Sequence, residues 1–157
     1  MKDGLRTEKI RSKLRELKDS LYYVGSFLPS DYALLDNRKD KNALYKEVEF
    51  AIQLIIDICA IIHSDIGKTT PSDEDSLILE VGREKVVSEL TVNKILLMKG
   101  FRNILVHKYE KIDDKKAYEA IKEGLDDFEL IIKEIEKFLE EHEKKERAKD
   151  EGKKKRE

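Results

Sequence analysis

The sequence predicts an all-α protein, a four- to five-helix up-and-down bundle, and three observations favour this fold class. Only 7 glycines and 2 prolines occur among 157 residues, so long segments contain no residue that breaks a helix. Apolar residues recur every three or four positions along most of the chain, which is the period of an α-helix. No segment shows the sustained alternation of apolar and polar residues that indicates a half-buried strand.

The first two helices are expected near residues 7–28 and 41–65. The first carries one apolar stripe and ends at Pro29, because a proline disfavours a helical conformation in the residue before it. The second carries apolar residues well beyond a single stripe, so we expect it at the centre of the bundle, packed on several sides. Gly67 suits its C-terminal cap.

Two further helices precede the motif discussed below. A short helix is expected over residues 73–85. The next begins at Ser88 or Thr91, since both residue types are good N-caps, and it extends to His107. Its apolar residues are Ile95, Leu96, Leu97, Met98, Phe101, Ile104, Leu105 and Val106.

The last helix opens at Asp113 or Asp114 and keeps its apolar face as far as Leu139. After that residue Glu, Lys and Arg take over. The predicted organisation is therefore one helical domain over residues 1–139. Residues 140–157 are expected to form a charged helix extension that ends in a disordered tail, because few apolar groups remain there to offset the entropy of ordering.

Composition excludes several classes of protein. The net charge of −2 provides no global field that would attract nucleic acid, so any RNA binding must depend on a local patch. The single cysteine, Cys59, excludes an internal disulfide and a Cys-rich zinc site. The N-terminus lacks the apolar stretch of a signal peptide. No apolar run approaches the roughly 20 residues that span a bilayer, so we expect a cytoplasmic protein that does not interact with membranes.

Two other candidate sites are weaker. Residues 67–69 read Gly-Lys-Thr, but a phosphate-binding loop needs a glycine where this chain has Ile62, and it follows a strand rather than a helix. His63 lies beside Asp65 near the end of the second helix, where a capping or surface role is favoured over metal binding because further ligands at helical spacing are missing. We predict neither a metal nor a cofactor.

Four residues near the end of the fourth helix form the strongest candidate site: Arg102, Asn103, His107 and Tyr109. Arginine offers a planar fork of donors suited to phosphate. Histidine is the side chain that most readily takes and gives protons near neutral pH. An arginine and a histidine that act together are the smallest set of side chains that could cleave RNA without a metal. A purely structural interpretation stays open, with Arg102 at the polar margin of the helix and His107 placed favourably near the negative end of the helix dipole.

The angular positions of these residues limit how they act together. At about 100° per residue, Asn103 and His107 lie roughly 40° apart and share one face. Arg102 and His107 lie roughly 140° apart, so one regular helix cannot aim both at the same phosphate. Either the helix unwinds near His107, or a second copy of the chain completes the site across a two-fold axis.

The ten residues from Gly100 to Tyr109, GFRNILVHKY, resemble the signature of the HEPN superfamily in its HepT-like toxin branch. That signature is Arg, usually Asn, three further residues, His, one residue and Tyr, and all four motif residues are present here. Residues 51–58 also resemble the apolar helix of the family, which has an aspartate near this point. The order of helices matches from about residue 7 to residue 139.

The resemblance implies a dimer that places two motifs in a shared cleft, and metal-independent endoribonuclease activity in a type II/VII-like toxin–antitoxin system. It assigns catalysis to Arg102 and His107, with Asn103 in support. The implied partner is an MNT-type nucleotidyltransferase, an antitoxin that transfers AMP to Tyr109. Because some members of the superfamily do not cleave RNA, the alternative is a non-catalytic helical module that binds such a nucleotidyltransferase.

Overall fold

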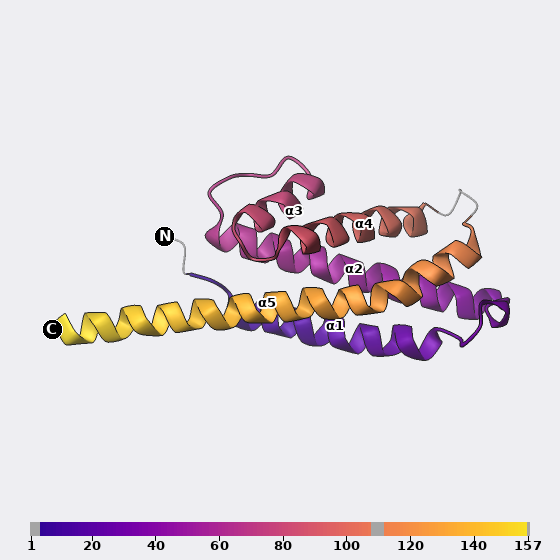
Figure 1. The fold of residues 1–157 in the computed structure, drawn as a ribbon, viewed down its shortest axis with the longest axis horizontal. Coiled ribbons are helices and arrows are strands. Elements are labelled where there is room, and N and C mark those ends of the chain that lie inside the picture. The colour runs from indigo at the N-terminus through magenta and orange to yellow at the C-terminus, as the bar shows by residue number, and fades with distance from the viewer. Residues whose placement is uncertain (1–3, 108–111, 157) are drawn as a thin grey trace.

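The computed structural model describes residues 4–107 and 112–156, which form an up-and-down bundle of α-helices without strands (Figure 1). The helices are α1 (Thr7–Phe27), α2 (Arg38–Ile66), α3 (Glu74–Arg83), α4 (Glu89–Val106) and α5 (Asp114–Arg156), and a short 3₁₀ helix, η1 (Tyr32–Leu34), follows α1. The predicted all-α fold is confirmed.

Side-chain caps set the N-termini of three helices. Asn37 accepts hydrogen bonds from the backbone N–H groups of Lys39 and Asp40 at 2.8 and 3.3 Å, so α2 begins at Arg38, slightly earlier than expected. Asp73 and Ser88 accept similar bonds at the starts of α3 and α4. Such caps satisfy N–H groups that have no partner within the helix.

The centre of the bundle is α2, as its broad apolar surface predicted. It packs against α1 on one side and against α3 and α4 on the other (Figure 1). Its side chains Leu44, Ile55 and Ile58 are at most 1% exposed. Burial on several sides requires a helix that is apolar around most of its circumference, and α2 supplies this core to the helix that carries the candidate motif.

The long α5 corrects one expectation. Beyond Leu139 the described chain forms the expected charged helix extension, which continues to Arg156 without the expected disordered tail and projects past the bundle (Figure 1). This part of the helix consists largely of residues with high helix propensity, and ion pairs between neighbouring turns, such as Glu143 with Arg147, stabilise it further. This extension keeps a contact with the bundle, because Arg11 of α1 donates to Glu143 at 2.8 Å. Neither α5 nor another described helix is apolar over enough length to cross a bilayer.

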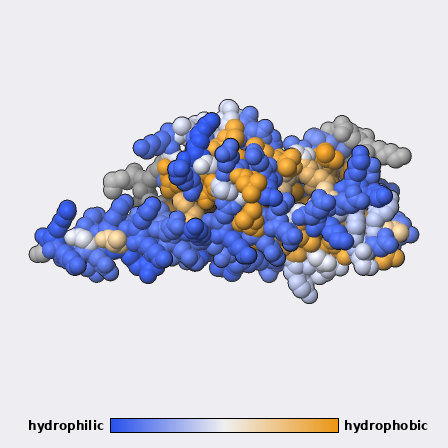
Figure 2. Space-filling view, viewed as in Figure 1, coloured by the Kyte–Doolittle hydropathy of each residue, from blue (hydrophilic) through white to orange (hydrophobic). Residues whose placement is uncertain are grey.

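Exposed apolar side chains gather over α3 and α4 (Figure 2). On α4, Leu97 is 76% exposed, Ile104 48% and Val106 45%. Beside them, residues of α2, α4 and α5 line a predominantly apolar groove of about 540 Å³. The helix that carries the candidate motif therefore has one face in the core and another that presents hydrophobic residues to solvent.

Candidate functional site

The C-terminal half of α4 positions Arg102 and His107 in different environments. Arg102 lies within the helix with its side chain 10% exposed, facing α2 and α3. His107 is the C-cap, with φ −83° and ψ 75°, and its side chain is exposed. The backbone therefore leaves the helical conformation at His107, as one of our two alternatives required.

The guanidinium of Arg102 is held by three side chains. Nη2 donates to Oε1 of Glu74 at 2.7 Å, and Nη1 donates to Oε2 of the same carboxylate at 3.1 Å. The second hydrogen of Nη1 reaches Oε1 of Gln53 at 2.8 Å, and that of Nη2 reaches Oδ1 of Asn103 at 2.9 Å. All four N–H groups of the two terminal nitrogens are thus engaged.

Burial of Arg102 contradicts its expected place at the polar margin of the helix. The cause is tertiary: α3 begins at Glu74, and its first turn brings a carboxylate over the inward side of α4. A guanidinium is tolerated there because each terminal nitrogen finds acceptors. The packing of α3 against α4 cannot be predicted from the periodicity of either helix.

Polar contacts continue from Arg102 along α2. The amide nitrogen of Gln53 donates to Oδ1 of Asp57 at 2.9 Å, and Lys13 of α1 lies at 4.0 Å from the other carboxylate oxygen. Asp57 is the aspartate on which the family resemblance partly rests. A chain of polar groups therefore connects α1, α2, α4 and α3 through the motif arginine.

The charge state of the central pair is fixed by mutual contact. The hydrogen bonds from Arg102 lower the pKa of Glu74 from its ordinary value, against the opposing effect of burial. In return Glu74 raises the pKa of Arg102. Both groups are ionised near neutral pH, and the bidentate carboxylate–guanidinium contact is of the charge-assisted kind.

Asn103 is half-buried and its orientation follows from chemistry. Because a guanidinium only donates hydrogen bonds, the oxygen of the Asn103 amide faces Arg102. Its NH₂ group is the remaining hydrogen-bond donor of the amide. Tyr109, the expected AMP acceptor, lies outside the described residues.

His63 differs from its expected capping or surface role. Its side chain is 4% exposed, with Nδ1 bonded to a carboxylate oxygen of Glu84 and Nε2 at 2.9 Å from the carbonyl oxygen of Thr69. Burial disfavours the charged imidazole, but these hydrogen bonds outweigh it and raise the pKa of His63. The structure explains the nearby glycine as well, since a Cβ at Gly67 would overlap the imidazole ring.

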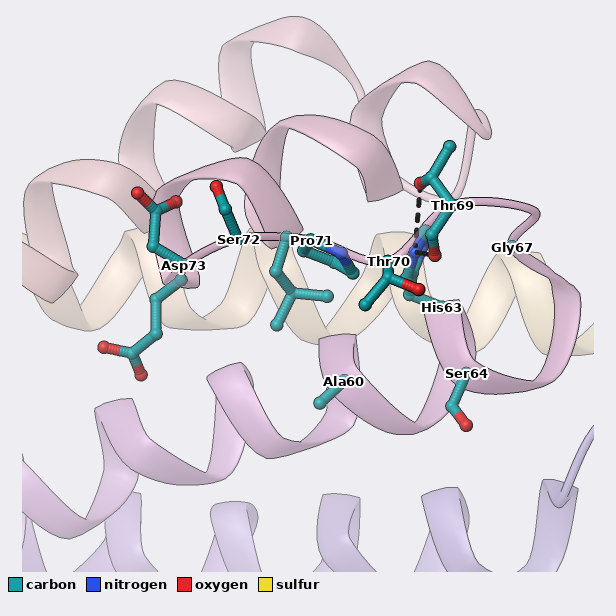
Figure 3. Close-up of a pocket in the computed structure, with 11 residues that line it drawn as sticks. Ala60, His63, Ser64, Gly67, Thr69, Thr70, Pro71, Ser72 and Asp73 are labelled. Carbon is teal, nitrogen blue, oxygen red and sulfur yellow. Dashed lines mark hydrogen bonds between the residues drawn. The ribbon is translucent and has the colours of Figure 1, made fainter.

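A cavity of about 560 Å³ adjoins this histidine (Figure 3). It is lined by the end of α2, by the connecting loop and by the start of α3, including Thr70, Asp73 and Glu74. Figure 3 shows the loop running from Thr69, which contacts His63, to Asp73 at the other end of the cavity. The same loop therefore joins the His63 contact to the residue that pairs with Arg102.

Sequence reasoning missed two residues of the Arg102 site, Gln53 and Glu74. Gln53 carried a signal, because it is the single glutamine of the chain and interrupts an apolar run of α2. Glu74 had no comparable signal in the sequence, since acidic residues are common in the first turn of a helix, where the helix dipole favours them. Only the packing of α3 against α4 reveals its contact.

A family model described as ribonuclease HepT-like matches residues 12–135 of the chain. Among curated proteins, the tRNA nuclease HepT of Aphanizomenon flos-aquae is 26% identical over 92 residues, a match that covers 59% of this chain and 63% of that protein. The aligned region thus spans less than two thirds of that nuclease.

Solved structures share the fold at lower identity. YutE of Bacillus subtilis, a cytosolic protein of unknown function, superposes with a TM-score of 0.74 at 22% identity, covering 87% of this chain and 92% of YutE. The tri-AMPylated HEPN toxin of Shewanella oneidensis, solved in complex with its MNT antitoxin, gives 0.75 at 17% identity, covering 81% and 96%. These likenesses establish the shared all-α fold.

Proposed function

The chain belongs to the ribonuclease HepT-like family, and on that premise we propose that it is a metal-independent endoribonuclease toxin of a HEPN/MNT toxin–antitoxin pair. The observation that carries the proposal is the motif itself. Arg102, Asn103 and His107 lie at the end of α4, and the side chain of His107 is exposed.

Cleavage in this proposal is a transesterification within the RNA. The 2′-oxygen attacks the adjacent phosphorus, and the bond from phosphorus to the 5′-oxygen breaks. His107 acts as general base for the 2′-hydroxyl proton or as general acid for the leaving oxygen. Arg102 holds the scissile phosphate and stabilises the charge that develops on its oxygens, while the NH₂ group of Asn103 orients the imidazole or contacts phosphate.

The active form in this proposal is a two-fold dimer whose interface includes α4. Support comes from the exposed apolar residues Leu97, Ile104 and Val106 and from the groove beside them. In such a dimer the two-fold axis would bring the motifs of both copies into a shared cleft.

Tyr109 is the proposed site of silencing by an MNT-type nucleotidyltransferase. Its phenolic oxygen would attack the α-phosphorus of ATP, forming a phosphodiester and releasing pyrophosphate. The added AMP brings bulk and negative charge beside His107, where RNA must bind. The tri-AMPylated HEPN toxin of Shewanella oneidensis, solved with its MNT antitoxin, supports AMP transfer as the form of silencing.

Mass spectrometry after incubation with the cognate nucleotidyltransferase and ATP checks this prediction. We expect AMP on Tyr109 and loss of cleavage, and we expect a Tyr109→Phe variant to escape covalent silencing. Tyr118 is the matched control, because its buried hydroxyl donates to the carbonyl oxygen of Pro29 at 2.7 Å. Modification at Tyr118 would overturn the assignment.

The direct test of the ribonuclease function is incubation of purified protein with total RNA in the presence of a chelator, beside His107→Ala. Cleavage that persists with chelator and is lost in the variant supports the proposal. The second candidate, a non-catalytic module that binds a nucleotidyltransferase, is favoured by one observation: the terminal N–H groups of Arg102 are already engaged. Absence of cleavage together with stable binding of that enzyme would favour the second candidate.

A further inference from the structure

We propose that Glu74 occupies on Arg102 the position that an RNA phosphate takes, so that RNA must displace an internal carboxylate to bind. The proposal rests on the proposed function in assigning phosphate to Arg102, and it adds a regulatory device to that site. Glu74 was not part of the motif and comes from a different helix.

The geometry of the pair is that of a phosphate complex. Two oxygens of Glu74 receive two parallel donors of Arg102, at 2.7 and 3.1 Å. Arginine binds carboxylate and phosphate through this same fork. A phosphate that approached the two terminal nitrogens would find both donors on that side taken, so bidentate binding of RNA and of Glu74 are mutually exclusive.

The other contacts of Arg102 need not change. Gln53 and Asn103 use the remaining hydrogen on each terminal nitrogen, and both accept from the arginine without bearing charge. They orient the fork in the free protein and retain that geometry when an anion replaces Glu74. Exchange of the carboxylate for phosphate therefore preserves a fully paired guanidinium, which a partly buried cation requires.

Glu74 has both the exposure and the space to leave. Its side chain is 38% exposed, compared with 10% for Arg102. It lies in the first turn of α3 and also lines the cavity of about 560 Å³ beside the preceding loop. Side chains with such access change rotamer without disturbing the core, although Asp73 at the same cavity adds a like charge that opposes the move.

The charges around the arginine favour the closed arrangement in the absence of RNA. Glu49 and Asp57 lie near enough to stabilise the charged guanidinium, in addition to Glu74. An RNA phosphate that approaches Arg102 is therefore repelled by these carboxylates as long as Glu74 stays in place. The expected consequence is weak RNA binding by the wild-type protein and tighter binding once the carboxylate is neutralised.

The experiment measures binding of a labelled 2′-O-methyl RNA oligonucleotide, which lacks the nucleophilic hydroxyl and is not cleaved. Glu74→Gln keeps the size of the side chain and removes its charge. The matched control is Glu80→Gln, on the same helix, where the lost partner is the exposed Arg83 instead of Arg102. We expect Glu74→Gln to bind about three- to ten-fold more tightly than the control, the effect of weakening one charge-assisted contact.

Dependence on Arg102 separates displacement from a general effect of charge. In an Arg102→Met background the gain from Glu74→Gln should vanish. Should the single Arg102→Met variant fail to fold, Glu74→Gln is compared with Glu74→Gln/Arg102→Met, which leaves neither partner of the pair as an uncompensated charge. Affinity of Glu74→Gln equal to that of Glu80→Gln, or retained in the double variant, would overturn the proposal.

Cleavage assays distinguish this proposal from the function on which it rests. At RNA concentrations below saturation, Glu74→Gln should cleave faster in proportion to its tighter binding. Tighter binding by Glu74→Gln without cleavage by any variant means that the internal competitor exists but the ribonuclease function is wrong. Slower cleavage at unchanged affinity means that Glu74 positions Arg102 instead of competing with RNA, which overturns the inference alone.

Discussion

Among single residues, the two proposed catalytic residues, Arg102 and His107, differ in how much they contribute to the fold. Arg102 is part of a hydrogen-bond network that connects α4 to α2 and α3. His107 occupies the C-cap position of α4, and its side chain is exposed. Residues of equal catalytic importance in the proposal therefore have unequal structural importance. His63 adds a third kind of polar residue, one that is buried and holds a loop.

Alanine substitutions separate the structural and chemical contributions of the motif. We expect Arg102→Ala to lower the free energy of unfolding by about 1–3 kcal/mol, because Gln53 and Glu74 lose their donor. We expect a loss near the lower end of this range, because water can replace Arg102 as the hydrogen-bond donor to Glu74. His107→Ala should change it by less than about 0.5 kcal/mol, while cleavage falls by roughly 10²- to 10⁴-fold.

Urea unfolding and cleavage rates measured on the same preparations check this pair. The contrast follows from the burial of Arg102 and the exposure of His107. A large loss of stability in His107→Ala would contradict it.

The stability of the protein should depend on pH through His63. Hydrogen bonds to Glu84 and Thr69 raise the pKa of the folded-state imidazole despite its burial, so the folded protein binds this proton more tightly than the unfolded chain does. The stabilisation is fully present below the unfolded value of about 6.5. It is lost as pH rises through the higher pKa of the folded state.

Free energies of unfolding for the wild type and His63→Gln, measured between mildly acidic and alkaline pH, test this dependence. The difference between the two proteins should be largest at acidic pH and should shrink as the pH rises. A difference that grows with pH would contradict the assignment. His142→Gln, at a partly buried histidine of α5 that is far from Glu84 in the sequence, is the control.

At the scale of elements, α5 serves two purposes along its length. Its first part completes the bundle with Ile121, Phe128 and Ile135, which are buried. Its last part is a charged helix that projects from the body (Figure 1). The final contacts with the rest of the chain lie near Glu143 and Arg147, which line a surface pocket with Leu5.

Truncation of α5 should therefore show a threshold. Removal of residues 148–157 should leave the melting temperature within about 2 °C, because the removed residues contribute little burial. Truncation before Glu143 should cost more, since Arg11 loses its partner. Thermal melts of both forms, with RNA binding measured in parallel, test the threshold; weaker RNA binding after the shorter truncation would show that Lys153, Lys154, Lys155 and Arg156 contact RNA.

At the scale of the whole molecule, the described chain leaves an apolar face on α4 uncovered while its core is complete. Leu97 is more exposed than most hydrophobic residues of a folded domain, at 76%. Exposed apolar patches of this kind mark interaction surfaces. The proposed dimer would bury this face and bring two motifs together.

A charge on this face should separate the protomers without unfolding them. We expect Leu97→Glu to be monomeric at micromolar concentration in sedimentation velocity experiments, with its melting behaviour retained apart from the loss of association. Leu34→Glu, at a residue of η1 that is 62% exposed, is the matched control and should remain dimeric. A wild-type protein that sediments only as a monomer would count against the shared cleft.

The fold class, the approximate extent of the helices and the central position of α2 are all predictable from the amino-acid sequence alone. These properties follow from local periodicity, capping residues and the breadth of an apolar face, all of which are encoded by neighbours in the chain. The motif was equally visible, because its residues lie within one short segment. The resemblance of this segment to the HepT-like signature is confirmed by the family match over residues 12–135.

The contacts of Arg102, by contrast, become visible only once the helices are packed together. Glu74 and Gln53 reach it from α3 and α2, and pairings between distant segments depend on how helices pack, which periodicity does not encode. The buried contact of His63 with Glu84 arises in the same way. The helix extension beyond Leu139 was predicted, but the disordered tail was not found among residues 140–156, because ion pairs between successive turns and strong helix propensities sustain the helix without an apolar face.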